Sequence, residues 1–489
     1  MANFVSSIFE QARLTTRALV EFSGNIFQPT VRLGVTGLSR AGKTVFITAL
    51  VHGLLRGGRF PVFEALAGGR IARVRLAPQP DDTIPRFAYE AHLDALLKQR
   101  EWPESTKQIS ELRLVIDYQS GNGAMRELIL DIVDYPGEWL LDLPLLTLSY
   151  EDWSAETIGL SRQPDRAKLA GEWHRHLATL DPAAEANEQA AQTAADLFRR
   201  YLLACRDERF ALSLLPPGRF LMPGELADTP ALTFAPLERL EGSAPSGSLW
   251  AMMRRRYEAY KDAVVRPFYR DHIARLDRQI VLVDALTALN AGPDAVRDLE
   301  RALTAILDSF NVGKNTILSS LFSPRIDRIL FAATKADLLH HTSHDRLERI
   351  LARLVSGATA RAQHSGTRID AAAMASVRAT REANVAGQHG SLPSIIGVPA
   401  AGEQAGGWTF DGQSEIVVYP GDLPDDPELM FKAGEIAFRG LAAGPSDDAD
   451  FRFLRFRPPL LETSETGKPA LPHIRLDRAL EFLIGDRLR

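Results

Sequence analysis

The segment from Gly37 to Thr44 has the residue types and spacing of a phosphate-binding loop. It reads Gly-Leu-Ser-Arg-Ala-Gly-Lys-Thr and fits the pattern G-x-x-x-x-G-K-T in full. The glycines let the backbone curl so that successive N–H groups point at phosphate oxygens, and the helix predicted to follow adds its partial positive charge. We expect Lys43 to reach the β- and γ-phosphates of a nucleotide and the Thr44 hydroxyl to ligate Mg²⁺. The predicted nucleotide-binding residues of this loop are Gly37, Ser39, Arg40, Ala41, Gly42, Lys43 and Thr44.

A second motif, Asp134-Tyr135-Pro136-Gly137, ends the apolar run from Leu128 to Val133. An aspartate at the end of a buried strand can hold Mg²⁺, and a glycine three residues later can offer its N–H group to a γ-phosphate. Because that contact exists only while the γ-phosphate does, the segment that follows can move on hydrolysis. We therefore predict Asp134 as a metal ligand and Gly137 as a catalytic residue.

The stretch from Trp102 to Thr106 lies just ahead of the strand predicted from Leu112, where a loop threonine that ligates Mg²⁺ is expected. Thr106 is the first candidate for metal, nucleotide and catalytic contacts, and Ser105 is the second. Trp102 can cover the nucleotide. The alternative is a capped turn with a packed tryptophan.

A base-reading motif, Thr334-Lys335-Ala336-Asp337, follows the predicted strand 328–333. The Asp337 carboxylate can accept hydrogen bonds from N1–H and the 2-amino group of guanine, whereas adenine offers neither, so an unpaired buried carboxylate would exclude ATP. The stem of Lys335 can lie along the base. The next strand ends in Ser376 and Val377, where a backbone N–H group can meet the guanine O6 atom.

These motifs require a sheet whose strands end at one edge. Apolar strands alternate with helical patterns, which predicts an α/β fold with three layers and a mixed, mostly parallel sheet. The strands are expected at 31–36, 112–118, 127–133, 279–284, 328–333 and 371–376, the second and third forming a hairpin around Gly121-Asn122-Gly123. Residues 383–413 are rich in Gly, Pro and Ala and are interpreted as a loop.

Four regions follow from this pattern. We predict an N-terminal amphipathic helix (1–28), a P-loop domain in two pieces (29–139 and 277–382), a large helical insertion (140–276) and a smaller α+β C-terminal extension (383–489) with strands near 416–419 and 451–456 and a final helix over 476–488.

Composition excludes several classes of function. The formal net charge of −5 gives no basic footprint for nucleic acid. A single cysteine, Cys205, excludes a disulfide framework and a Cys-rich metal site, and it fits a reducing cytosol. No apolar run reaches the length of a membrane span.

Two charged clusters leave alternatives open. Residues His340, His341 and His344 can hold a metal through His340 and His344, or they can belong to a solvated loop. The run Arg254-Arg255-Arg256 can supply an arginine finger or bind phosphate lipids, or it can form a solvated helix face.

The order of these motifs is similar to that of the GTPase class related to translation factors. In particular, the segments 37–44, Glu101 to Thr106 and Asp134 to Trp139 resemble those of the YcjX-like bacterial stress-associated P-loop GTPase family, and the match in order and size spans most of the chain. The resemblance implies a Ras-like GTPase fold. It also implies a cytoplasmic nucleotide-binding protein that works near the inner membrane, with a membrane-protein partner reached through the N-terminal helix or the helical insertion.

Two residues depart from the small regulatory GTPases. Glu138 follows the D-x-x-G glycine, where many such proteins have a water-orienting glutamine, and Thr334 replaces the more frequent asparagine. A carboxylate repels the γ-phosphate, so Glu138, a candidate catalytic residue, predicts slow hydrolysis without an activator.

The favoured function is binding of GTP and its hydrolysis with Mg²⁺ to GDP and phosphate, coupled to motion of the loops around Thr106 and Gly137. A nucleotide-sensing scaffold with incidental hydrolysis is an alternative of a different class. An ATPase or a small-molecule kinase is a third, which Asp337 and the D-x-x-G motif oppose.

Overall fold

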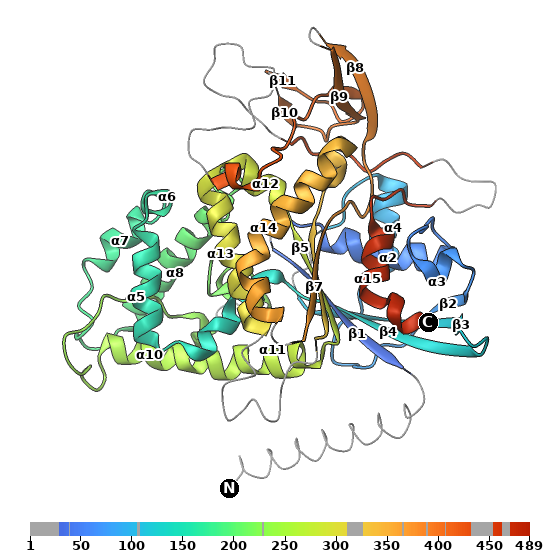
Figure 1. Ribbon diagram of the computed structural model, residues 1–489. Helices are drawn as coiled ribbons and strands as arrows, with labels where there is room; N and C mark the ends of the chain where they lie inside the picture. The colour runs from blue at the N-terminus through green and yellow to red at the C-terminus, as the bar shows by residue number, and fades with distance from the viewer. Residues whose placement is uncertain are drawn as a thin grey trace.

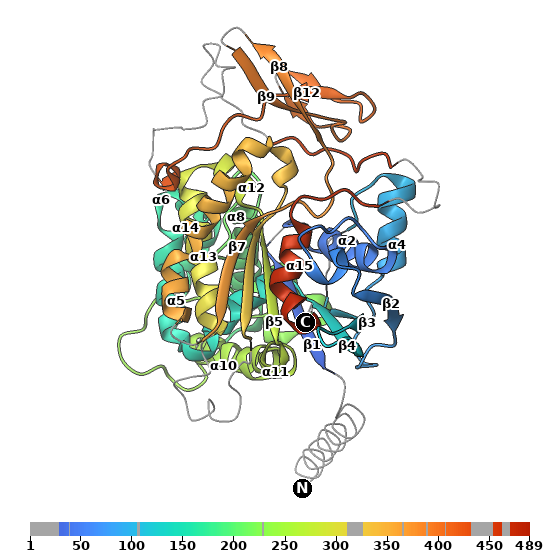
Figure 2. The same cartoon turned by 45° about the vertical axis from the view of Figure 1, so that its right-hand side comes forward.

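A seven-stranded sheet forms the centre of the molecule (Figures 1 and 2). The computed structural model describes residues 29–38, 40–104, 108–226, 229–310, 326–363, 366–387, 390–405, 407–431, 453–461 and 470–489. The strand order is β2-β3-β4-β1-β5-β6-β7. The strands are β1 (Thr30–Gly37), β2 (Ile71–Ala77), β3 (Ser110–Gln119), β4 (Met125–Asp134), β5 (Arg278–Val283), β6 (Arg328–Ala333) and β7 (Arg368–Ala373).

The sheet is mixed but mostly parallel. Strands β4, β1, β5, β6 and β7 pair in parallel, whereas β2 and β3 add an antiparallel edge through the predicted hairpin between β3 and β4. The predicted α/β fold with a mixed, mostly parallel sheet is therefore confirmed.

Helices cover both faces of the sheet because its central strands are apolar on both sides. Along β5, Ile280 and Leu282 enter one core cluster, and Val281 and Val283 enter the other. Helices α2 (Lys43–Arg56), α4 (Tyr89–Asp94) and α15 (Leu476–Ile484) lie on the first face. Helices α12 (Ala285–Ala291), α13 (Pro293–Phe310) and α14 (His344–Gln363) lie on the second.

The final helix, α15, belongs to this sheet. Its residues Leu480, Leu483 and Ile484 are fully buried in the same cluster as Ile280. Arg278 of β5 donates from Nε to the Leu483 carbonyl oxygen at 3.0 Å. Sequence analysis assigned this helix to a separate C-terminal extension, whereas in the structure it packs on one face of the central sheet.

The prediction of a loop over residues 383–413 is wrong. Strands β8 (Arg381–Gly387) and β9 (Gly390–Gly397) form an antiparallel pair, and β12 (Ile416–Val418) joins β9. A two-stranded sheet of β10 (Gln404–Ala405) and β11 (Trp408–Thr409) lies between them in sequence. These residues form strands because each pairs with a neighbouring strand through backbone hydrogen bonds. Their Gly- and Pro-rich composition does not indicate this pairing.

The remaining C-terminal prediction is met in part. The strand expected at 416–419 is β12. At 453–456 the described residues form only an isolated bridge, between Phe456 and Pro399, and residues 451–452 lie outside the described part of the chain. The small sheet stands as a lobe at the top of both views (Figures 1 and 2).

Residues 150–275 form a helical bundle beside the sheet, where the sequence predicted an insertion (Figure 1). Its core is rich in aromatic rings, such as Trp153 stacked on Tyr257. Its helices are α5 (Tyr150–Ser161), α6 (Pro164–Ala167), α7 (Gly171–Leu177), α8 (Glu188–Cys205), α9 (Gly218–Leu221), α10 (Leu249–Tyr260), η5 (Lys261–Val265) and α11 (Arg266–Asp271).

The other helical segments of the described residues are mostly short. They are α3 (Glu64–Ala67), η1 (Ala95–Gln99), η2 (Gly137–Thr147), η3 (Gly224–Leu226), η4 (Pro230–Leu232), η6 (Ile273–Arg275), η9 (Ala336–Leu338), η10 (His341–Ser343), η11 (Pro427–Phe431) and η12 (Gly485–Leu488). The predicted helix over residues 1–28 lies outside the described residues. Among the helices that the structure describes, none combines the length and the apolar character needed to cross a membrane.

Candidate nucleotide-binding site

The predicted phosphate loop connects β1 to α2 as a tight turn. Strand β1 ends at Gly37, and α2 begins at Lys43. Arg40 and Gly42 have φ angles of 61° and 77°, in the left-handed region, and the Ala41 N–H group donates to the Leu38 carbonyl oxygen at 3.1 Å. Ser39 lies outside the described residues. The start of α2 therefore faces the inside of this turn, as a phosphate site at a helix N-terminus requires.

Lys43 and Asp134 bring two of the motifs together. Asp134 ends β4, which lies beside β1 in the sheet, and its Oδ1 atom is 2.7 Å from Lys43 Nζ. The Asp134 side chain is 1% exposed and that of Lys43 is 10% exposed. A buried carboxylate and a buried ammonium thus stabilise each other at the carboxyl edge of the sheet.

Gly137 of the D-x-x-G motif rests on the phosphate loop. A Cβ atom added at Gly137 would lie 2.9 Å from Leu38 N and closer still to the Gly37 carbonyl oxygen. No other residue type fits this approach without moving the backbone. The glycine predicted to meet a γ-phosphate therefore lies against the loop predicted to hold the same phosphate.

Thr44 contacts the segment predicted to carry the second metal-binding hydroxyl. The Thr44 hydroxyl donates to the Glu104 carbonyl oxygen at 3.2 Å. Ser105 and Thr106 lie outside the described residues. The Trp102 indole N–H donates to the Phe456 carbonyl oxygen at 2.7 Å, so the structure shows this side chain in contact with the C-terminal segment.

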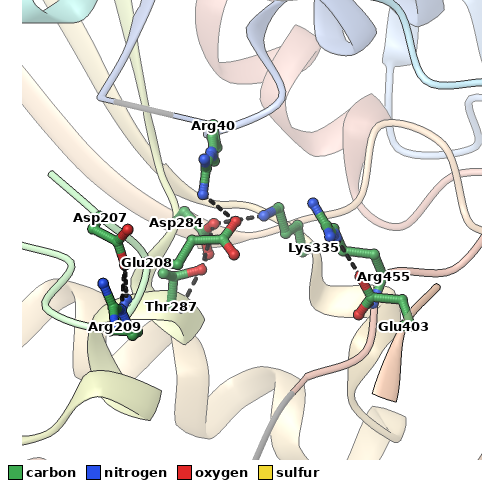
Figure 3. Close-up of polar contacts among 9 residues, drawn as sticks. All are labelled: Arg40, Asp207, Glu208, Arg209, Asp284, Thr287, Lys335, Glu403 and Arg455. Atoms are coloured by element: carbon green, nitrogen blue, oxygen red, sulfur yellow. Dashed lines mark hydrogen bonds and ion pairs between the residues drawn. The ribbon is translucent and has the colours of Figure 1, made fainter. Parts of the chain in front are cut away.

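Lys335 is positioned by an aspartate to which sequence analysis assigned no role. Lys335 has a φ angle of 61°, and its Nζ atom lies 2.5 Å from Oδ2 of Asp284 (Figure 3). Asp284 directly follows β5, and its carboxylate also accepts from the Thr287 N–H and hydroxyl groups. An acidic residue at the carboxyl end of a parallel strand was the signal that could have found it.

Asp337 is buried beside the segment after β7. Its Oδ2 atom accepts from the Ala379 N–H group at 2.9 Å, and its carbonyl oxygen accepts from the Thr380 hydroxyl. Burial raises the pKa of the Asp337 carboxyl to about 6, although the Ala379 hydrogen bond opposes this shift. Ser376 and Val377, at most 9% exposed, precede these residues, so the structure brings the two parts of the predicted base-reading site together.

Residues 31–488 match the YcjX-like family, DUF463. The chain belongs to this family. It is 39% identical over 477 residues to a protein of Escherichia coli K12 named Ras-like GTPase YcjX, an alignment that covers 94% of this chain and 96% of the relative. A Shewanella oneidensis protein of the same name is 35% identical over 490 residues, with 94% of each chain covered.

In this YcjX-like protein the helical bundle also reaches the site. Arg206, which follows α8, lies 3.2 Å from Glu138, and Glu208 pairs with Arg40 of the phosphate loop (Figure 3). No pattern in the sequence predicted these contacts, because each joins segments about 70 to 170 residues apart whose charges have no local signature.

A cavity lies where these contacts meet. Its walls come from the phosphate loop, the residue after the D-x-x-G glycine, the loop after α8 and the start of α12, and they include Leu38, Arg40, Glu138, Arg206, Glu208 and Asp284. On the other side of Lys335, Arg455 of the C-terminal segment pairs with Glu403 at 2.6 Å (Figure 3). Three regions of the YcjX-like chain therefore surround the carboxyl edge of the sheet.

The segment after Gly137, η2, is fastened to the helical bundle. Asp142 of η2 accepts hydrogen bonds from the Gly218 N–H group and the Tyr260 hydroxyl, both at 2.6 Å. Burial raises the pKa of the Asp142 carboxyl to about 6, although these two hydrogen bonds oppose the shift. The Arg219 guanidinium lies 3.2 Å from the centre of the Trp139 ring, a cation–π contact. These contacts hold η2 against the helical bundle.

Arg254 and Arg255 are exposed, as expected for a solvated helix face, whereas Arg256 has partners within the protein. Arg256 is buried, lies 2.5 Å from Glu188 and donates to the Thr233 carbonyl oxygen, which is a structural role. Neither alternative for the histidines fits fully: His340 and His344 are both buried rather than solvated, and the His344 Nε2 atom faces the Leu339 carbonyl oxygen at 3.4 Å rather than His340.

A different histidine pair meets Glu382. The ligand atoms of His340, His341 and Glu382 lie within 4.8 Å of one another. The guanidinium of Arg378 already contacts Glu382 at 3.1 Å, and this positive charge disfavours a cation at the same place.

Proposed function

We propose that this protein binds GTP and hydrolyses it to GDP and phosphate. The observation that carries the proposal is the meeting of two motifs at one sheet edge, where Lys43 of the phosphate loop faces Asp134 and Gly137 of the D-x-x-G segment lies on the backbone of Gly37. The relatives named Ras-like GTPase support it. A P-loop with a D-x-x-G segment packed on it is the arrangement that hydrolysis of a γ-phosphate requires.

Positioning and charge carry the chemistry in this proposal. Lys43 leaves Asp134 to neutralise the β- and γ-phosphates, and the N–H groups of the loop from Gly37 to Thr44 hold their oxygens. The N–H group of Gly137 contacts the γ-phosphate. Because Glu138 is acidic and does not replace the water-orienting glutamine of other GTPases, hydrolysis by the isolated protein is slow.

The residues at this edge also suit Mg²⁺. The Thr44 hydroxyl and the Asp134 carboxylate are hard oxygen donors, the class of ligand that Mg²⁺ takes, and Asp134 is buried beside the loop. Thr106, two positions after Glu104 in the sequence, completes the proposed ligand set. When bound, the ion supplies neutralisation of charge on the phosphates.

Selectivity for guanine rests on Asp337. Its carboxylate is proposed to accept from N1–H and the 2-amino group, with Lys335 along the base and a backbone N–H group at Ser376 or Val377 meeting O6. Burial makes this carboxylate costly to leave unpaired, so the same pocket disfavours ATP. Trp102 and Ser105 remain proposed nucleotide contacts.

A role as a nucleotide-dependent partner-binding module has a specific observation in its favour. The contacts of Asp142 and Trp139 fasten η2 to the helical bundle, so a change at Gly137 on loss of the γ-phosphate reaches the bundle surface. We propose that nucleotide state is reported to a protein partner in this way. The cytoplasmic location, the partner at the inner membrane and the stress role implied by the resemblance remain predictions.

Calorimetry and phosphate release test the proposal directly. The full chain is titrated with GTP and with ATP in Mg²⁺ buffer, and phosphate release is followed under single-turnover conditions. We expect GTP to bind and to be hydrolysed slowly, and ATP to bind at least 100-fold more weakly, on the order of the discrimination that a polar pocket achieves. Equal binding of the two nucleotides would favour the ATPase alternative.

A further inference from the structure

The loop after α8 brings two charged residues from the helical bundle to the predicted phosphate site. Arg206 contacts Glu138, the residue directly after the D-x-x-G glycine, and Glu208 contacts Arg40 of the phosphate loop. These residues line one cavity with Leu38. Glu138 directly follows Gly137, whose N–H group is proposed to meet the γ-phosphate. The Cα atoms of these two residues are therefore about 3.8 Å apart.

This loop is fixed at both ends. At its start, the Arg206 N–H group donates to the Leu202 carbonyl oxygen of α8 at 3.1 Å. At its end, the Ser213 and Leu214 N–H groups donate to Oδ2 of Asp298 at 2.6 and 2.9 Å. Asp298 is buried and also pairs with Arg166. The backbone of Arg206 is therefore fixed beside the cavity, and its side chain extends to Glu138.

We propose that Arg206 is a catalytic residue that the helical bundle supplies to the proposed GTP hydrolysis within one chain. The inference rests on the proposed function. In the reaction a water oxygen forms a bond to the γ-phosphorus, and the bond from that phosphorus to the β–γ bridging oxygen breaks. The electron pair of the broken bond stays on GDP, and the water proton ends on phosphate. The guanidinium of Arg206 donates to the phosphoryl oxygens, on which negative charge is spread in the transition state.

Two other arginines of the helical bundle have different partners. Arg219 lies over the Trp139 ring, and Arg256 is paired with Glu188 inside the bundle. Arg206 is half-buried, and it contacts the carboxylate of Glu138, the residue that directly follows Gly137. Glu138 then has a role that its acidity explains, because it holds the guanidinium ready and has its own charge balanced by it.

The main test compares Arg206→Ala with Arg209→Ala in the full chain. Arg209 lies in the same loop, is exposed and pairs with Asp207, so it serves as a matched control (Figure 3). We expect Arg206→Ala to lower the single-turnover rate of GTP hydrolysis by about 100-fold or more, a modest effect for an arginine finger. The Kd for GDP should change less than about threefold, and Arg209→Ala should match the parent.

A second readout does not depend on turnover. Aluminium fluoride with GDP imitates the transferring phosphoryl group, so the parent should bind this pair more tightly than GDP alone and Arg206→Ala should lose the gain. Arg206→Gln, which keeps a polar stem, repeats both measurements if the alanine variant folds poorly. Parent-like turnover and fluoride binding in either folded variant would overturn the inference.

A double variant separates direct contact from neutralisation of Glu138. If Arg206 acts only by balancing that carboxylate, Arg206→Ala with Glu138→Gln would recover the parent rate, which would also overturn the inference. We expect the double variant to stay as slow as Arg206→Ala. A parent protein that neither binds nor hydrolyses GTP would instead refute the proposed function, which these variants do not measure.

Discussion

The ammonium group of Lys43 lies 2.7 Å from the carboxylate of Asp134, and both side chains are almost completely buried. Each group therefore offsets part of the cost of burying the other. Phosphate oxygens can replace Asp134 as the partner of Lys43, and this exchange leaves the carboxylate available to a cation. In the proposed function, the same pair would contribute both to nucleotide affinity and to the stability of the strand ends.

Lys43→Ala should remove GTP turnover and weaken GTP binding, because the phosphates lose a buried positive charge. It should also lower the free energy of unfolding by about 3–5 kcal/mol, because Asp134 is left buried without this partner. Phosphate release and urea unfolding measure the two effects. The double variant Lys43→Ala, Asp134→Ala should regain much of the stability but none of the turnover. Turnover at the parent rate in Lys43→Ala would show that this loop is not the reactive site.

Asp337→Asn should lose GTP affinity by about 2–4 kcal/mol, the scale of a charge-assisted bond lost together with an unpaired buried group. The variant turns one acceptor into a donor, so the guanine amino group faces an NH₂ group. Xanthine carries a carbonyl oxygen at that position, and the variant should therefore bind XTP more tightly than the parent does. Calorimetric titration with both nucleotides gives the result, and unchanged GTP affinity would remove Asp337 from the site.

GDP binding should weaken as pH falls through about 6, where the buried Asp337 carboxyl takes up a proton. The protonated carboxyl has lost an acceptor that guanine needs, so binding favours the ionised form and is strongest above that pKa. For a pKa near 6, the Kd should be about tenfold higher at pH 5 than at pH 7. Asp337→Asn, measured with the same nucleotide, corrects for titration of the phosphates. Parallel pH profiles for the two proteins would contradict the assignment.

Gly218→Ala should destabilise the contact between η2 and the helical bundle. A Cβ atom at Gly218 would lie 3.1 Å from Trp139 N and closer still to the Glu138 carbonyl oxygen, so the two backbones must separate. Forcing atoms into such a packed contact costs about 1–3 kcal/mol, which thermal unfolding can measure. Gly159→Ala in α5, where an added Cβ meets no atom within 4 Å, is the control. Equal melting temperatures for the two variants would show that this contact yields easily.

Six of the seven strands of the central sheet could be predicted because their signals are local, whereas the edge strand β2 was not predicted. The run from Leu128 to Val133 and the residues of β6 are apolar and end in polar motifs, and each motif fits one edge of a parallel sheet. The positions of Lys43, Asp134 and Gly137 followed from these strands. Asp284 had the same kind of signal, at the end of β5, and only its partner Lys335 shows what it does.

The rest depends on contacts between distant segments. Arg206 and Glu208 lie in a charged stretch with no periodic pattern, and only the packing of α8 brings them to Glu138 and Arg40. Strand β9 contains Pro393 and two glycines, so its pairing with β8 and β12 was hidden by composition. Such long-range pairings cannot be predicted from a short window of sequence.

The place of α15 has a consequence for the order in which the molecule can be completed during synthesis. Leu480 and Leu483 cover the same face of the sheet as Leu33 of β1, and about 450 residues separate them in the chain. A ribosome adds about 5–20 residues each second, so the phosphate loop leaves the ribosome tens of seconds before this cover exists. Until the last helix has been made, one apolar face of the nascent sheet is incompletely covered. This face is a surface that chaperones can bind, and the domain that carries the predicted nucleotide site is completed only when α15 packs on it.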